Sequence, residues 1–259
     1  MLDVSSRLGL DPEDAAAVRA ASFPPARVER YAAELRAAIG GRERLEDWPA
    51  AEPLFYPHVF LAALPDARAF HAERGIADEV SWATLADLGR VMRIHRGAKG
   101  EPGLDEENWL KLHWRGLLFE LGRLQFDRWK RDTLGVHIPV GGPLDPAAVD
   151  DALARARPFF DRHFPEDGYR TAVCTSWLLD PQLAEVLPAD SNIVRFQRRF
   201  ELLEEGAYEG DEDVFKFVFR RVDPPLDELP QRTTLERALV AHLRAGGHWQ
   251  VRKGRLQLP

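Results

Sequence analysis

The sequence predicts an α+β protein, with a helical first part and a mixed α/β second part that meet near residue 120. In the first part, apolar residues recur at the spacing of amphipathic helices. In the second part, short alternating or β-branched runs are separated by glycine-containing turns and further helices. The chain has 259 residues, enough for one large domain or two small ones with a buried core. We expect a helical domain over residues 1–120, a mixed domain over 121–222, and a linker, helix and hairpin over 223–259 that complete the second domain.

The first part is expected to be almost entirely helical. Asp11 and Pro12 are typical of a helix start, because an N-cap residue there precedes a proline at the first helical position. Pro24 and Pro25 then end that helix. Further helices are expected over residues 26–39, 55–63, 66–73, 80–94 and 108–119, with a loop over 97–103.

The second part is expected to alternate strands and helices. A helix over 145–164 has a regular apolar stripe, and Pro158 should kink it or end it early. Two short helices are expected at 180–187 and 192–199. Strands are expected over 121–126, 136–140 and 169–176, with a hairpin connection over 127–134, and an antiparallel pair over 200–204 and 214–220.

The last segment is expected to be a linker followed by a helix and a hairpin. Residues 223–230 hold three prolines and three acidic residues, which is typical of a linker. Thr233 and Glu236 have the spacing of a capping box, and Gly246-Gly247 ends the helix that they begin. Residues 248–258 alternate around Lys253-Gly254 and predict a closing hairpin.

Composition and charge exclude several classes of function. The net charge of −7 argues against bulk nucleic-acid binding. The charge is uneven, because residues from 231 onward carry about +5; this basic tail either contacts the phosphates of a cofactor or is a solvated surface. No stretch approaches the ~20 apolar residues of a membrane span, and nothing resembles a signal peptide. The single cysteine, Cys174, excludes an intramolecular disulfide and fits a cytoplasmic protein.

One strand, turn and helix are arranged as in many small-molecule sites. The β-branched run over 136–140 leads into a Gly141-Gly142-Pro143 turn, and the helix that follows opens at Asp145-Pro146. A helix N-terminus beside strand ends attracts anions, and it is a usual place for a ligand in an α/β sheet. The sequence therefore predicts a binding site for a phosphate-bearing small molecule at this turn.

Five short motifs spread over nearly the whole chain show a family resemblance. They are Trp109-Leu-x-x-His113-x-x-Gly116, Leu121-Gly-Arg-Leu-Gln-Phe126, His137-Ile-Pro139, Cys174-x-Ser-Trp-Leu-Leu-Asp180-Pro and Asn192-x-x-x-Phe-Gln197. Taken together, the chain resembles a group of bacterial acyltransferase-like proteins. Members of that group have a helical N-terminal domain and a C-terminal domain similar to the N-acyltransferase fold called GNAT.

This resemblance implies a fold and an activity. The fold would be a helical N-terminal domain packed on a GNAT-like domain with a mixed, largely antiparallel sheet. The activity would be transfer of an acyl group from acyl-CoA, the co-substrate, to a small-molecule amine. The amine would attack the thioester directly, with no acyl-enzyme and no metal. Two departures motivate an alternative, a non-catalytic GNAT-like protein for ligand binding or interaction: the family's phosphate-loop consensus is missing, and Phe196 stands where many members have a tyrosine.

Site residues follow from the same resemblance. His137 would be the general base, and Ser176 would protonate the leaving thiolate through a water. Arg123, Gln125 and Trp177 would line the substrate pocket. The expected contacts of acyl-CoA are Ile138, Val140, Gly141, Gly142, Leu144, Asn192 and Phe196.

Each of these roles has a structural alternative. His137 could be a sheet histidine, Trp177 a core side chain, and Arg123 with Gln125 the solvated side of a strand pair. A second chemical alternative is a thiol acyltransferase or amidase that uses Cys174 with His137. No Cys-x-x-Cys, His-Glu-x-x-His, nucleotide-loop or Gly-x-Ser-x-Gly motif occurs in the sequence, so metal, nucleotide and α/β-hydrolase chemistry are not expected.

Overall fold

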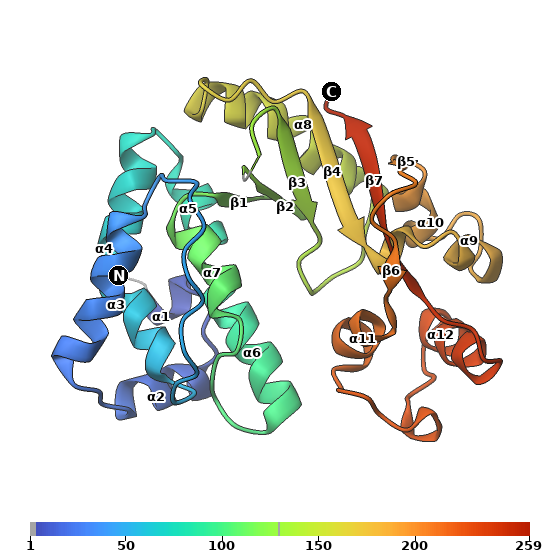
Figure 1. The fold of residues 1–259 in the computed structure, drawn as a ribbon, viewed down its shortest axis with the longest axis horizontal. Helices are drawn as coiled ribbons and strands as arrows, with labels where there is room; N and C mark the ends of the chain where they lie inside the picture. The colour runs from blue at the N-terminus through green and yellow to red at the C-terminus, as the bar shows by residue number, and fades with distance from the viewer. Residues whose placement is uncertain (1–3, 129) are drawn as a thin grey trace. The chain divides into compact units, whose positions relative to one another are not determined.

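The structure is a computed structural model that describes residues 4–128 and 130–259 (Figure 1). It divides into two compact units. Within the described residues, the first unit holds residues 4–121 and 126–128, and the second holds 122–125 and 130–259. The predicted α+β class and the mixed, largely antiparallel sheet are confirmed. None of the described helices combines the length and the hydrophobicity that a membrane span requires.

The first unit is helical up to its last residues, as predicted. The helix over 55–63 and the helix over 66–73 are in fact one, which runs through Pro65 because its buried face continues across that residue. The single helix predicted over 80–94 is two. The elements are α1 (Val4–Arg7), α2 (Pro12–Ala20), α3 (Pro25–Ala37), α4 (Phe55–Glu73), α5 (Asp78–Leu85), α6 (Asp87–Lys99), α7 (Glu107–Trp114) and the strand β1 (Leu118–Leu121).

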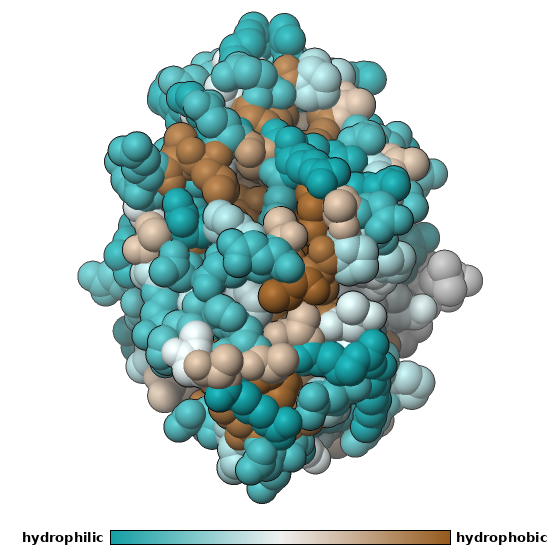
Figure 2. Space-filling view, turned by 90° about the vertical axis from the view of Figure 1, so that its right-hand side faces the viewer, coloured by the Kyte–Doolittle hydropathy of each residue, from teal (hydrophilic) through white to brown (hydrophobic). Residues whose placement is uncertain are grey.

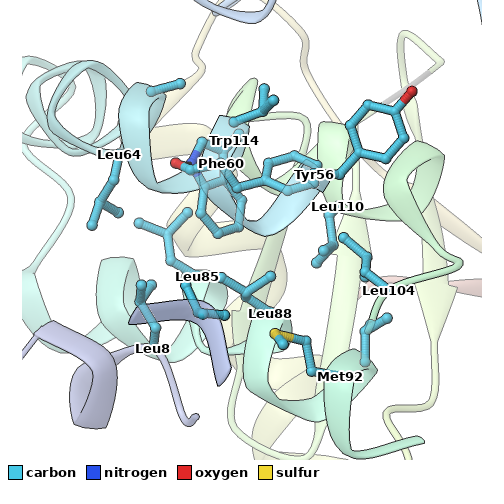
Figure 3. Close-up of a cluster of buried hydrophobic side chains, with 14 of the residues drawn as sticks. Leu8, Tyr56, Phe60, Leu64, Leu85, Leu88, Met92, Leu104, Leu110 and Trp114 are labelled. Atoms are coloured by element: carbon cyan, nitrogen blue, oxygen red, sulfur yellow. Dashed lines mark hydrogen bonds between the residues drawn. The ribbon is translucent and has the colours of Figure 1, made fainter. Parts of the chain in front are cut away.

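A cluster of buried apolar side chains joins the helices of the first unit (Figure 3). Trp114 belongs to this cluster and is fully buried, and its indole Nε1 donates to the carbonyl of Phe60 at 2.8 Å. The residues labelled in Figure 3 are Leu8, Tyr56, Phe60, Leu64, Leu85, Leu88, Met92, Leu104, Leu110 and Trp114.

Buried polar contacts explain the first motif of the resemblance. The indole Nε1 of Trp109 donates to Oδ2 of Asp87 at 2.6 Å, and Nε2 of His113 lies 3.3 Å from the same oxygen. Gly116 has φ 66°, and a Cβ there would stand 2.2 Å from the ring of Phe70. The motif therefore fixes α7 against α6 and allows a close approach that only glycine permits.

The second unit is built on a mixed sheet. The strand β3 (Thr133–His137) pairs with β4 (Thr171–Ser176) in parallel, and β4 pairs with β7 (Gln250–Gln257) in antiparallel. The strands β5 (Glu201–Leu202) and β6 (Tyr208–Glu209) also pair with β7 in antiparallel. The strand β2 (Leu124–Asp127) begins in this unit. The helices are α8 (Pro146–His163), α9 (Gln182–Val186), α10 (Asn192–Gln197), α11 (Asp211–Val214) and α12 (Thr234–Arg244), with short turns η1 (Trp177–Leu179), η2 (Phe215–Phe219) and η3 (Leu226–Glu228).

The helix α8 connects the two parallel strands. A crossover helix of this kind packs on one face of the sheet that it joins. Its buried stripe of Val149, Ala152, Leu153, Ala156 and Phe160 matches the buried alternate residues of β3 and β4. It continues past Pro158 to His163, so the predicted early end does not occur. The capping box predicted for α12 is confirmed, since Thr233 and Glu236 cap each other's backbone N–H groups.

Several predicted boundaries are wrong. The helix predicted over 108–119 ends at Trp114, and the chain enters β1. The strand predicted over 121–126 is broken at Gly122, whose φ of 80° makes a turn. The strand predicted over 136–140 is β3, which ends at His137, and the connection predicted before it includes residue 129, which lies outside the described residues.

Two further predictions at the end of the chain are also wrong. Residues 214–220 are helical and end at Arg220, whose φ is 55°, so they form no strand pair. The predicted closing hairpin is the single strand β7. Gly254 is not a turn residue; it sits where a Cβ would approach that of Phe200 to 2.8 Å. This glycine therefore marks a close approach within the sheet.

The surface is mostly hydrophilic in the view of Figure 2, with bands of hydrophobic residues between polar ones. Large apolar side chains of the second unit that remain exposed are Val186, Leu202, Tyr208, Phe217 and Val222.

Candidate functional site

The candidate site lies where the parallel strands β3 and β4 end. Their register runs from Thr133 opposite Thr171 to Val136 opposite Cys174. Beyond this point β4 stays paired with β7 as far as Ser176, whereas the chain after His137 leaves the strand. The carboxyl ends of parallel strands meet at one edge of a sheet, and this edge is where ligands bind in such folds.

A loop over residues 138–144 leads from this edge into α8. Gly141 and Gly142 have φ of 118° and 70°, and a Cβ at either position would meet open space. Asp145 caps the helix by accepting from the N–H of Ala148 at 3.1 Å. The loop therefore delivers the N-terminus of an 18-residue helix, with its positive end of the dipole, to the strand ends.

Two arginines place positive charge around this loop and helix start. The guanidinium of Arg123 donates to three carbonyls of the loop, those of Pro139, Gly142 and Pro143. Arg199, just after α10, donates from Nε to Oδ1 of Asp150 at 2.7 Å and from Nη2 to the carbonyl of Pro146 at 3.2 Å. Arg199 thus ties the end of α10 to the first turns of α8, with its charge paired to Asp150.

His137 and Ser176 lie at the same sheet edge but on opposite faces. Side chains alternate along a strand, and residues opposite each other in register point to the same side. Val136 and Cys174 are both buried, so Ser176 belongs to the buried face of the sheet and His137, half-buried, to the other. The Oγ of Ser176 also accepts from the N–H of Leu178 at 3.1 Å and so begins the turn η1.

The three residues predicted for the substrate pocket lie in three different environments. Arg123 contacts the loop, as described above. Gln125 is buried on β2, with 1% of its surface exposed. Trp177, in η1, packs into a core cluster with Leu183 and Val194.

The residues predicted from the last motif are mainly part of the core. Phe196 is fully buried and its ring centre lies 5.0 Å from that of Phe200. Asn192 is half-buried and begins α10, where Ser191 caps the helix through the N–H of Val194.

Two residues that sequence reasoning left without a role hold the turn after β4. Gln197 donates from Nε2 to the carbonyls of Leu178 and Asp180, at 2.9 and 2.8 Å. The buried carboxylate of Asp180 accepts from the N–H of Gln250 on β7 at 2.7 Å. Their only signal in the sequence is their place in the two motifs of the resemblance, and these contacts give the two motif positions a structural reason.

The cysteine is unsuited to nucleophilic chemistry. Cys174 lies on the buried face of β4, and burial raises the pKa of its thiol to about 12. At neutral pH the thiolate is therefore essentially absent, and the thiol acyltransferase alternative loses its nucleophile.

One group of possible metal ligands occurs in the described part of the chain. Glu209, Asp211 and His248 each bring a ligand atom within 4.8 Å of the others. The carboxylate of Asp211 is already engaged, because it accepts from the N–H of Trp249 and lies 2.7 Å from Nδ1 of His248. The group therefore has a structural role at the start of β7, and we assign no metal to it.

Two family models together match most of the chain. One, described as an N-acyltransferase N-terminal domain, matches residues 2–116. The other, described as a GNAT-like C-terminal domain, matches residues 118–256. No curated protein sequence matches the chain at a significant level.

Solved structures of acyltransferases are similar over 99% of this chain and 87% of their own length. One in complex with decanoyl-CoA is 44% identical, with a TM-score of 0.94. Another, in complex with decanoyl-CoA and teicoplanin, is 44% identical, with a TM-score of 0.93. A third, in complex with CoA and 10C-teicoplanin, is 43% identical, with a TM-score of 0.92.

Proposed function

Because the chain belongs to the family that joins an N-acyltransferase N-terminal domain to a GNAT-like C-terminal domain, we propose that it transfers an acyl group from acyl-CoA to an amine. The observation that carries this function is the likeness, over 99% of the chain, to an acyltransferase in complex with decanoyl-CoA. The edge of β3 and β4 supplies what that donor needs. Glycine-rich backbone and a helix N-terminus meet its phosphates, and the strand ends meet its pantetheine.

The donor is proposed to lie along the loop and between the diverging strand ends. Its diphosphate would accept from backbone N–H groups of the non-proline residues of 138–144 and from the first turn of α8, whose Pro146 carbonyl is held by Arg199. Its thioester would then reach the end of β3, beside His137.

The reaction is proposed to be a direct displacement. The neutral amine attacks the thioester carbonyl, the carbon–sulfur bond breaks, and the CoA thiolate leaves with the electron pair. His137, on the half-buried face, takes the proton of the amine. Ser176, on the opposite face, relays a proton to the thiolate through a water: its Oγ takes a proton from solvent as it gives up its own, and His137 releases the amine's proton to solvent. The Oγ accepts from the N–H of Leu178 and keeps its O–H for this donation. The base that removes a proton from the amine and the acid that supplies one to the thiolate thus lie on different faces of the sheet.

The ligands of the similar acyltransferase structures also suggest the substrate class. One of these structures contains decanoyl-CoA with teicoplanin, and another contains CoA with 10C-teicoplanin. These two pairs are what the beginning and the end of one acyl transfer would contain. We propose a medium-chain acyl-CoA as donor and an amine of a teicoplanin-like molecule as acceptor.

Acceptor-dependent release of CoA thiol tests the proposal. Decanoyl-CoA and acetyl-CoA would be supplied with and without teicoplanin, and free thiol followed over time. We expect release that requires both partners and is faster with the decanoyl donor. The alternative, a binding protein without catalysis, is motivated by Phe196, which has no proton to give. It predicts that decanoyl-CoA raises the unfolding temperature while no thiol appears with any acceptor.

A further inference from the structure

One side chain holds the whole loop between β3 and α8. The Nε of Arg123 donates to the carbonyl of Pro143 at 2.9 Å, Nη1 to that of Pro139 at 3.1 Å, and Nη2 to that of Gly142 at 3.1 Å. Each of the three guanidinium nitrogens therefore contacts a different point of the same loop. A planar guanidinium makes such divergent bonds at once, which the single ammonium of a lysine cannot do.

The glycine pair at the centre of the loop does little to fix the loop conformation. Pro139 and Pro143 have no N–H to donate, and Gly141 and Gly142 have positive φ values with open space where a Cβ would be. Glycine loses more conformational freedom on ordering than any other residue. The bonds from Arg123 therefore supply order where the local sequence is least able to do so.

These bonds also set the direction of two amides. In a trans peptide the C=O and the N–H that follows it point in opposite directions, and no cis peptide occurs among the described residues. The carbonyls of Pro139 and Pro143 point to Arg123. The N–H groups of Val140 and Leu144 consequently point away from it.

We propose that Arg123 is a positioning residue for the donor: it orders the loop over 138–144 so that the amides of Val140 and Leu144 face the phosphates of acyl-CoA. This inference rests on the proposed function. It replaces the prediction from the sequence that Arg123 lines the substrate pocket. The benefit is one of preorganisation, because a loop that is ordered before binding loses less entropy when the donor arrives.

The test compares two donors in the full-length chain carrying Arg123→Ala or Arg123→Lys. One donor is decanoyl-CoA; the other is S-decanoyl-pantetheine, which has the same thioester but no phosphate. For Arg123→Ala we expect the KM for decanoyl-CoA to rise about tenfold, the effect of ~1.4 kcal/mol, with kcat nearly unchanged. The KM for S-decanoyl-pantetheine should stay at the wild-type value. Arg123→Lys should show a smaller rise in the KM for decanoyl-CoA. If the alanine variant does not fold, the lysine variant is used for the test instead.

Arg155→Ala is the matched control. Arg155 is exposed on α8 and pairs with Asp151 at 2.7 Å, so this change removes an arginine without touching the loop. Both of its KM values should equal those of the wild type. An unchanged KM for decanoyl-CoA in Arg123→Ala, or equal losses with both donors, would overturn the positioning role while wild-type turnover stands. A wild type that uses neither donor would instead overturn the proposed function itself.

Discussion

At the scale of single residues, the proposed chemistry depends on His137 and Ser176. Their position near strand ends could be predicted from the sequence, because each stands near the end of a short apolar run. Their arrangement could not, because the predicted strand over 136–140 is displaced from β3, which ends at His137. A displaced strand gives no reliable register, and register decides which face a side chain occupies. In the structure, the side chains of His137 and Ser176 lie on opposite faces of the sheet.

The role of His137 as base predicts a specific loss. In His137→Gln the half-buried ring is replaced by an amide that cannot accept a proton at neutral pH. We expect kcat to fall by ~10²–10⁴ and the acidic limb of the pH–rate profile to disappear, while the KM for the donor stays nearly the same. Steady-state rates between pH 5.5 and 9 check this, with His58→Gln in the first unit as control. A full-rate variant with an unaltered profile would remove the base assignment.

The burial of Cys174 predicts an inert thiol. Because burial raises its pKa to about 12, the folded protein at pH 8 holds the thiolate in only about one molecule in 10⁴. Iodoacetamide should therefore label Cys174 slowly in the native state and rapidly in denaturant, as read by intact mass. The sign is fixed by the raised pKa: native reactivity grows only as the pH rises toward that value. An acyl adduct on this residue after incubation with decanoyl-CoA would contradict direct attack on the thioester.

At the scale of elements, the long strand β7 shows where local patterns are insufficient. Lys253-Gly254 between alternating residues predicts a hairpin, since glycine is common in turns. In the structure the same residues continue straight, because β7 has β4 on one side and β5 on the other, and the side chain of Phe200 lies close to Gly254. Tertiary pairing thus decides whether this glycine makes a turn or continues a strand, and no residue near Gly254 in the sequence indicates which.

The close approach at Gly254 predicts a loss of stability on adding one methyl group. In Gly254→Ala the new Cβ would lie 2.8 Å from the Cβ of Phe200 and 3.0 Å from Leu179. We expect a cost of about 1–3 kcal/mol, a fall of several degrees in the unfolding temperature. Gly97→Ala is the control: its Cβ meets open space in α6, where alanine favours a helix over glycine. Equal unfolding temperatures for Gly254→Ala and the wild type would show that the sheet has room there.

At the scale of the whole molecule, the fold class could be predicted from the change of periodicity near residue 120. The loop and the helix N-terminus could also be predicted, since a glycine pair before Asp145-Pro146 is a local signal. The contacts that shape the site could not. Arg123 reaches Pro139, and Arg199 reaches Asp150 from 49 positions away along the chain. Such pairs are set by the folded arrangement, and no spacing rule connects them.

The central claim, acyl transfer from acyl-CoA to an amine, is tested most directly by the structure of the product. Decanoyl-CoA and teicoplanin would be incubated with the protein and the product analysed by tandem mass spectrometry. We expect one decanoyl group in amide linkage on an amine-bearing fragment, formed together with CoA. Decanoate as the sole acyl product, or a donor that stays intact with teicoplanin and with simple amines, would contradict it.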